Sequence, residues 1–365
     1  MSKNKKLVVL SAFYEPYMSG AEQMVREVLE RLGSNYETVL LTGRFDENLP
    51  FIEERKNFKI IRLGIGHKKI DKFLYPVLAA FKAQSIKPDI IHAIMESYAG
   101  AVLVILKYLY PQAKRILTLQ SGDLYTSEKM DNFLFKFIMK TIHKSPHVIT
   151  AISRFLKKCS VDLGTDPDKI KVIPNGADFS NIPSEVKSIS NRVFFAGRLS
   201  REKGAYYMLQ AWPLVLKEIP GAKLVQVGDG DMREEAFKII KDLNIEDSVE
   251  LKLTIPHDEY MKEFKKSEVV ICPSLAEGLG IAFIEAQLCG RPIIGTNVGG
   301  IPEVIDDQKT GLLIEPKNSE QIAGALIKLL KDTDLRNKLV KNAKESVKRF
   351  DWNKIIKDIE NIYEG

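Results

Sequence analysis

The chain has 365 residues, of which 45% are hydrophobic and 28% charged, the balance of a soluble globular protein with room for two domains and a core in each. Its formal net charge of +6 comes from one half: residues 1–185 hold 27 Lys and Arg against 20 Asp and Glu, whereas residues 186–365 hold 27 against 28. Three cysteines without a CxxC pair and apolar runs far shorter than a membrane span argue against a disulfide framework, a zinc site and a transmembrane helix.

The first half alternates short β-branched runs with amphipathic stretches, a pattern typical of a parallel sheet covered by helices. The start, MSKNKKLVVL, leads straight into a strand-like run and lacks the features of a signal peptide, so we expect a cytoplasmic protein. Helical spacing of apolar residues predicts a helix over Ala21–Leu32. The short runs predict strands at Leu7–Phe13, Glu37–Thr42, Phe58–Leu63, Asp89–Ala93, Arg115–Leu119, His147–Ala151 and Lys171–Ile173. Several of them are apolar on consecutive positions, as strands buried on both faces should be.

The stretch Phe179–Arg192 is polar, carries Pro183 and has no period, which indicates a linker between two domains, 1–182 and 183–350. A second strand–helix series follows, and only helices are predicted from Ser319 onward. Its strands are predicted at Val193–Ala196, Lys223–Val227, Val249–Leu251, Val269–Cys272, Pro292–Gly295 and Gly311–Ile314. The fold class is therefore α/β, with two parallel sheets that we expect to face each other across a cleft. Ligands of such sheets bind beyond the carboxyl ends of the strands.

The densest polar cluster follows the predicted strand Val269–Cys272. Glu277 precedes a helix that begins near Gly280, and Glu285 lies about one turn inside that helix. Backbone N–H groups at a helix start favour an anion such as phosphate, and two separated carboxylates can hold two hydroxyl-rich parts of one ligand. The alternative is a helix-capping acid beside a solvated Glu.

Basic and glycine residues follow other strands. Arg198 offers a fork of donors and Lys203 a compact charge, both suited to phosphate oxygens. Gly228-Asp229-Gly230 lacks the third glycine of a dinucleotide fingerprint, so a nicotinamide site is disfavoured, but it can admit a base or ribose. Gly20 joins the first strand to the first helix, where backbone donors can meet a phosphate. Exposed basic loops and plain turns are the alternatives.

These motifs together resemble glycosyltransferase family 4, a family of retaining enzymes with the GT-B fold of two Rossmann-like domains. The resemblance covers nearly the whole chain, and the order and spacing of the motifs carry it. The matching segments are Ser19-Gly20, Pro174–Asp178, Gly197–Leu199 with Lys203-Gly204, Val227–Gly230, Glu277 with Glu285, Gly299–Glu303 and Gly311–Leu313. By this resemblance, the final helix, in a segment 351–365, would cross back to the first domain.

The resemblance also implies roles for individual residues. Arg198 and Lys203 would bind the donor diphosphate and stabilise its leaving charge, so that no metal or other cofactor is needed. Glu277 would hold the sugar hydroxyls and Glu285 the ribose. The departing phosphate oxygen would accept the proton of the acceptor hydroxyl on the same face of the sugar. The remaining donor contacts would come from Gly20, Gly197, Gly228, Gly278, Leu279 and Gly280.

One departure from the family pattern concerns the first domain. Members usually carry a His after the fifth strand, and Gln120 stands there in this chain. Gln can hydrogen-bond a hydroxyl but cannot gain a charge near neutral pH. Asp123 is a candidate to share the polar role, and Asn175 belongs to another matching segment. His92 ends a predicted strand and is either a ligand-facing residue or a structural one with its hydrogen bonds satisfied.

The acceptor is expected on the first domain, where two stretches are both basic and apolar. These are Lys68–Tyr75 and Phe133–Lys144, and the second places Lys among aromatic residues in a manner suited to an anionic membrane. A core helix with one solvated Lys edge is the alternative. We therefore expect a lipid-linked or membrane-proximal acceptor, with the protein at the inner face of the membrane. No basic stripe of the nucleic-acid-binding kind is present in the sequence.

The sequence as a whole predicts a hexosyltransferase that uses a UDP- or GDP-linked sugar and serves cell-surface polysaccharide or glycolipid synthesis. A nucleotide-sugar 2-epimerase uses the same fold and would act on the donor alone. The third hypothesis is a degenerate transferase that binds a sugar or a partner without turnover, and Gln120 is its main support.

Overall fold

The computed structural model describes residues 4–33, 35–180, 182–184 and 186–365. The chain forms two compact units, each described here by itself: unit 1 comprises Met1–Asn175 with Trp352–Gly365, and unit 2 comprises Gly176–Asp351. The boundary falls before the expected one at 182 because the N–H of Ala177 donates to the carbonyl of Phe350 at 2.9 Å, which joins this segment to unit 2.

Unit 1 is built on one eight-stranded sheet in the order β3-β4-β2-β1-β5-β6-β7-β8. All neighbours are parallel except β3 and β4. The bounds are β1 Lys5–Leu10, β2 Tyr36–Gly43, β3 Ile52–Glu54, β4 Phe58–Leu63, β5 Ile90–Ile94, β6 Lys114–Leu119, β7 Val148–Ala151 and β8 Ile170–Val172. Each predicted strand is present with its ends shifted by a few residues. The sequence missed β3, because three half-exposed edge residues leave no apolar pattern.

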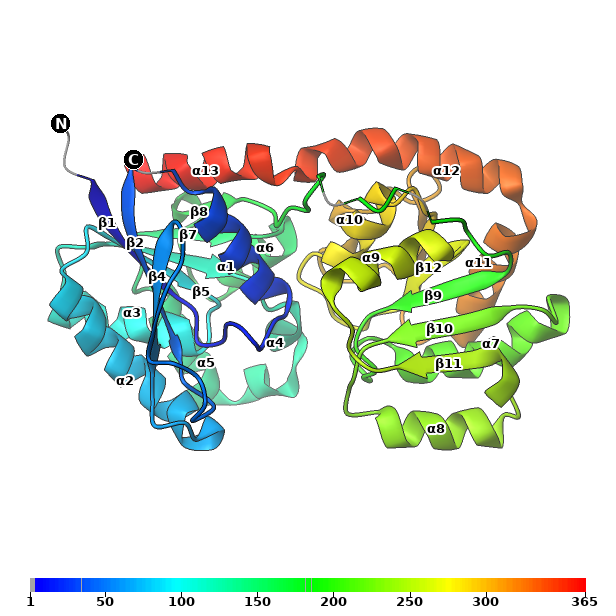
Figure 1. The fold of residues 1–365 in the computed structure, drawn as a ribbon, viewed down its shortest axis with the longest axis horizontal. Coiled ribbons are helices and arrows are strands. Elements are labelled where there is room, and N and C mark those ends of the chain that lie inside the picture. Colours follow the sequence, from blue (N-terminus) through cyan, green and yellow to red (C-terminus); the bar gives the residue numbers. More distant parts are fainter. Residues whose placement is uncertain (1–3, 34, 181, 185) are drawn as a thin grey trace. The chain divides into compact units, whose positions relative to one another are not determined.

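Helices cover both faces of this sheet (Figure 1). They are α1 Gly20–Arg31, α2 Lys68–Ile86, α3 Tyr98–Leu109, α4 Gly122–Thr126, α5 Phe133–His143, α6 Arg154–Asp162 and α13 Trp352–Glu364. Helix α13 packs against α1, and its residues Trp352, Ile355, Ile359 and Tyr363 belong to the unit 1 core. Within the described residues, no helix combines the length and apolar character needed to cross a lipid bilayer.

Unit 2 has a six-stranded, fully parallel sheet in the order β11-β10-β9-β12-β13-β14. Its strands are β9 Arg192–Ala196, β10 Lys223–Val227, β11 Val249–Lys252, β12 Val269–Cys272, β13 Ile293–Thr296 and β14 Leu312–Ile314. Its helices are α7 Ala205–Glu218, α8 Arg233–Asp242, α9 His257–Lys266, α10 Ile281–Leu288, α11 Ser319–Lys331 and α12 Thr333–Ser346. The strand order reverses between β9 and β12, and α/β sheets bind ligands at such a reversal.

His92 is a core residue, and the reading that placed it toward a ligand is wrong. It lies in the middle of β5 and is 1% exposed. Its Nδ1 lies 2.7 Å from the hydroxyl of Tyr363, and its Nε2 lies 2.6 Å from Oγ1 of Thr118. Burial lowers the pKa of His92 to about 3, so the ring stays neutral and ties α13 to the sheet.

Replacing Tyr363 by Phe tests this tie. The variant leaves a ring nitrogen of His92 buried without its partner, which costs about 1–3 kcal/mol. We expect a lower melting temperature in a thermal unfolding experiment. Tyr108→Phe is the control, because Tyr108 is 79% exposed and should melt as the wild type does. Equal melting of both variants would contradict the role given to Tyr363.

Candidate functional site

The candidate site in unit 2 is built from the two loops that follow β9 and β12. These strands are parallel neighbours, with Val270 beside Phe194, so their carboxyl ends meet at the same edge of the sheet. The loop after β9 carries Arg198 and Lys203, and the loop after β12 carries Glu277. Strands far apart in sequence thus bring the predicted basic and acidic residues to one place.

Lys203 and Glu277 form the central ion pair of this site. The Nζ of Lys203 lies 2.5 Å from Oε2 of Glu277, and each side chain is 20% exposed. Burial by itself lowers the pKa of Lys203, but the negative charge of Glu277 outweighs it, and the pKa is raised. Lys203 is therefore a firmly protonated cation. This ion pair was not predicted from the sequence, where Lys203 and Glu277 were each expected to contact the ligand separately.

Close backbone contacts hold the two loops together. The N–H of Leu275 donates to the carbonyl of Glu202 at 2.7 Å. Gly204 has a φ of +75°, and a Cβ there would lie 2.0 Å from the carbonyl oxygen of Pro273. Gly299 lies equally close to Glu277: a Cβ at Gly299 would lie 2.1 Å from the carbonyl oxygen of Glu277. Side chains at either glycine would push the Glu277 loop away from Lys203.

The glycines named in the sequence lie along the same edge. Gly280 has a φ of +94° and directly precedes α10, whose first N–H groups lack partners within the helix, as at any helix start. Gly197 and Gly228 directly follow β9 and β10, and the side-chain amide of Gln226 donates to both of their carbonyls, at 2.8 and 3.1 Å. The buried side chain of Gln226 therefore links the loops that follow β9 and β10. The side chain of Leu279 is buried and belongs to the core.

Arg198 and Glu285, two further predicted donor contacts, differ in how firmly their side chains are held. Arg198 is 65% exposed, and its nearest acid is Glu202 at 3.5 Å, a long and weak contact. Glu285 is buried within α10, and its Oε1 lies 2.8 Å from Nε2 of His257. His257 begins α9 and was missed in the sequence. Its position after β11, at the same sheet edge, was the available signal.

Unit 1 brings together Gln120 and Asn175. Their amides exchange two hydrogen bonds: Asn175 donates to Gln120 at 2.8 Å, and Gln120 donates back at 3.2 Å. Asn175 is 1% exposed and Gln120 partly exposed, whereas Asp123 is exposed in the first turn of α4. Gly20 is the first residue of α1, and the carboxylate of Glu22 already accepts from the N–H of Ser19 at this helix start.

Glu96 is a buried acid that the sequence did not single out. It follows β5, is fully buried, and accepts hydrogen bonds from the N–H groups of Gln120 at 3.0 Å and Ser121 at 3.2 Å. Burial raises its pKa to about 7, against the opposing effect of these hydrogen bonds. Glu96 therefore sets the backbone turn that presents Gln120.

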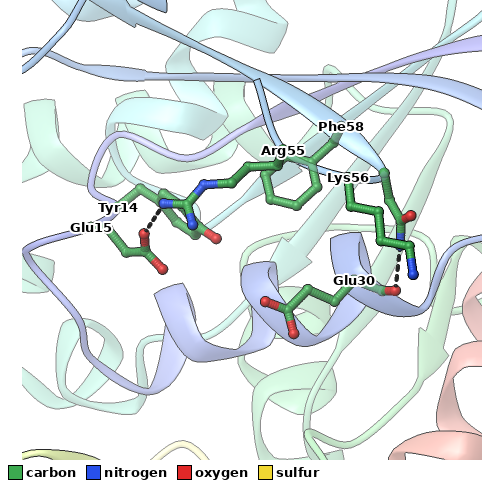
Figure 2. A pocket seen from close by; sticks show the side chains of 7 residues that line it. Tyr14, Glu15, Glu30, Arg55, Lys56 and Phe58 are labelled. Carbon is green, nitrogen blue, oxygen red and sulfur yellow. Dashed lines mark hydrogen bonds and ion pairs between the residues drawn. The ribbon is translucent and has the colours of Figure 1, made fainter. Parts of the chain in front are cut away.

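A separate hollow of about 350 Å³ in unit 1 contains none of the predicted residues (Figure 2). It lies between the loop after β1, helix α1 and the start of β4. Arg55 reaches across to Glu15 at 2.6 Å (Figure 2). The side chain of Asn57 donates to the backbone carbonyl of Glu30 at 2.8 Å. These two contacts bridge the walls of the hollow, and none of the residues of the candidate donor site lies in it.

The raised pKa of Glu96 predicts a pH effect on stability. The folded state holds the proton more tightly than the unfolded state, whose pKa is near 4.5, so Glu96 costs stability as pH rises from about 4.5 to about 7. The total is up to about 3 kcal/mol. Glu96→Gln removes this titration. Over this pH range the free energy of unfolding of the wild type, measured with denaturant, should therefore fall relative to that of the variant. Glu128→Gln, at an exposed position, is the control. Parallel pH profiles for wild type and Glu96→Gln would contradict the assignment.

Comparison with known proteins matches both units. Residues 18–181 match Glycosyltransferase Family 4, and residues 180–346 match the glycosyl transferases of group 1. An uncharacterized glycosyltransferase of Methanocaldococcus jannaschii is 32% identical over 298 residues, which is 76% of this chain and 75% of that protein.

Two solved structures share the fold over the whole chain. Sucrose-phosphate synthase from Thermosynechococcus elongatus has a TM-score of 0.84 at 21% identity, covering 99% of this chain and 98% of that one. Anabaena HepE, solved with UDP and glucose, has a TM-score of 0.80 at 19% identity, covering 99% of each chain. The chain therefore belongs to glycosyltransferase family 4 and has the GT-B fold.

Proposed function

We propose that the chain is a retaining, metal-independent hexosyltransferase that uses a UDP- or GDP-linked sugar. The acceptor is a hydroxyl group in cell-surface polysaccharide or glycolipid synthesis. The observation that carries this proposal is the ion pair of Lys203 with Glu277 at the strand reversal of unit 2. A protonated amine and a carboxylate, side by side at a ligand-binding edge, suit a diphosphate and a sugar.

The donor is proposed to lie along the carboxyl edge of the unit 2 sheet. The likeness to Anabaena HepE, which was solved with UDP-glucose, supports a nucleotide-sugar ligand. Arg198 is exposed and weakly paired, so its guanidinium can turn to a phosphate with little loss. The start of α10 after Gly280 adds backbone donors for the same charge.

In the proposed reaction, the bond between the sugar C1 and the diphosphate oxygen breaks while a bond from C1 to the acceptor oxygen forms. The acceptor proton passes to the departing phosphate oxygen on the same face, which retains the configuration at C1. Lys203 and Arg198 stabilise the negative charge that grows on the diphosphate, the task a divalent cation performs in other transferases. Glu277 keeps Lys203 charged and in place, and it accepts hydrogen bonds from sugar hydroxyls.

Glu285 is proposed to accept hydrogen bonds from the ribose. His257 holds one carboxylate oxygen at 2.8 Å, which orients the group before the ligand arrives. A preoriented carboxylate loses less freedom on binding than a mobile one. His257 is thus a positioning residue of the proposed donor site.

A sugar-nucleotide-binding protein without turnover is the second candidate. The amide pair of Gln120 with Asn175 favours it, because these polar groups already satisfy each other where the family usually has a His. A panel of nucleotide sugars and nucleoside diphosphates, tested by thermal shift with chelator present, examines both candidates. A rise in melting temperature with one donor supports a nucleotide-sugar site. The absence of any rise in folded protein would contradict both.

Turnover separates the two candidates through Lys203→Ala. The lost cation should lower the rate of nucleoside diphosphate release from the bound donor by about 100- to 1,000-fold. Lys262→Ala is the matched control, because Lys262 is an exposed lysine of α9 paired with Glu259 at 2.7 Å. Release at the wild-type rate in Lys203→Ala would refute the assigned role. A wild-type protein that binds donor and never releases product would point to the binding protein or, if the recovered donor carries a changed sugar, to the epimerase.

Binding alone is tested through Glu285→Ala. Loss of a charge-assisted hydrogen bond should weaken nucleoside diphosphate binding by about 10- to 100-fold in calorimetry. Glu259→Ala on α9 is the control, because its side chain is 52% exposed. The melting temperature of each variant shows whether it has folded. Unchanged affinity in folded Glu285→Ala would exclude the ribose role.

A further inference from the structure

Helix α5 presents large apolar side chains to solvent. Phe133, Leu134, Phe137 and Ile138 are 84%, 65%, 59% and 45% exposed. The opposite face is buried through Met139, Ile142 and His143. The helix is therefore apolar both toward the core and away from it. The alternative of an ordinary core helix with one solvated Lys edge is wrong for this segment.

Helix α2 repeats the arrangement. Its exposed apolar residues fall at the spacing of one helical stripe, while Tyr75, Ala79 and Ala83 bury the other face. Such a stripe is usually covered in a folded protein. The stripe consists of Ile70, Phe73, Leu74, Val77, Leu78 and Phe81, which are 46%, 76%, 38%, 47%, 38% and 58% exposed.

The two stripes belong to one surface of unit 1. Both helices contact α3, which lies between them on the same face of the sheet (Figure 1). Tyr108 of α3 is 79% exposed and adds an aromatic ring to the outside of this layer. We name the exposed apolar residues of α2 and α5 the outer apolar surface. Exposed apolar area of this kind on one layer of a unit marks a contact with another phase or molecule.

Lysines surround the outer apolar surface. Lys68 and Lys69 begin α2, and Lys136, Lys140 and Lys144 lie along the outward side of α5, all exposed. On α2 the acid Asp71 is buried and accepts hydrogen bonds from backbone N–H groups, so its carboxylate is not on the exposed surface. Exposed aromatic and aliphatic groups rimmed by lysines are the chemistry of a helix lying in an anionic lipid interface.

A shallow apolar hollow borders α5. Its volume is about 510 Å³, and it lies between α5 and the short helical turn Glu128–Asp131. Leu134, Phe135 and Ile138 line it together with the polar residues Glu128, Lys129 and Asn132. The apolar part of this lining fits hydrocarbon. A second copy of the chain fits less well, since a two-fold contact through α5 would bring two lysine-bearing faces together.

We propose that the outer apolar surface docks unit 1 onto an anionic lipid bilayer. The apolar residues of α2 and α5 enter the interface, and the lysines bind the lipid headgroups. This inference concerns binding alone and does not depend on the proposed transfer reaction, because it is tested without donor or acceptor. It would place a lipid-linked acceptor close to the enzyme.

The experiment is cosedimentation of the full chain with vesicles of phosphatidylcholine alone or mixed equally with phosphatidylglycerol. We expect binding to the anionic vesicles at about 0.01 M salt and release at about 1 M, where charge is screened within about 3 Å. Phe133→Ser with Phe137→Ser should weaken binding by at least about 10-fold. Lys136→Glu with Lys140→Glu should do the same. Phe237→Ser is the control, because Phe237 is 51% exposed on α8 of unit 2.

Melting temperatures close to wild type show that each variant has folded, and the Lys pair serves if the Phe pair does not fold. Failure of wild type to sediment with anionic vesicles at low salt would overturn the proposal. So would wild-type binding by a folded variant of either pair. Self-association of the chain, abolished by the same changes and unaccompanied by vesicle binding, would assign the surface to a second copy instead.

Discussion

The contact between Lys203 and Glu277 depends on how closely two loops approach at the strand reversal of unit 2. Glycine permits that approach, because a Cβ at Gly204 or Gly299 would meet a backbone carbonyl at 2.0 or 2.1 Å. The loops therefore place a full positive charge beside a carboxylate before any ligand is bound. Charge that is already in position needs little reorganisation when negative charge develops on a leaving group.

In unit 1 an acid, Glu96, likewise fixes the position of a candidate site residue. The carboxylate of Glu96 is fully buried and binds two successive backbone N–H groups, which sets the turn that carries Gln120. Gln120 then pairs with Asn175 through both of its amide atoms. The replacement of the usual His by Gln removes a group that titrates near neutral pH and keeps a donor and an acceptor. Any ligand at this place must share or displace that amide pair.

The outer apolar surface has a cost for a protein in water, since exposed phenylalanines favour association. The lysines around it partly offset this by keeping copies of the chain apart. The same lysines account for part of the positive excess of the first half of the sequence. Apolar bulk and charge thus occur together on two helices of one layer, while the paired charges of the candidate donor site lie in unit 2.

The sequence by itself determined the two α/β units, the place of every strand but β3, the loops that carry Arg198, Lys203 and Glu277, and the helix that carries Glu285, because apolar periodicity and glycine positions are local properties. The tertiary structure alone decided which residues that are far apart in the sequence contact each other. Glu96 contacts Gln120, His257 contacts Glu285, and His92 contacts Tyr363 over 271 positions of sequence. It also decided that the apolar faces of α2 and α5 stay uncovered. Periodicity shows which face of a helix is apolar. Whether that face is buried depends on the elements that the fold packs against it.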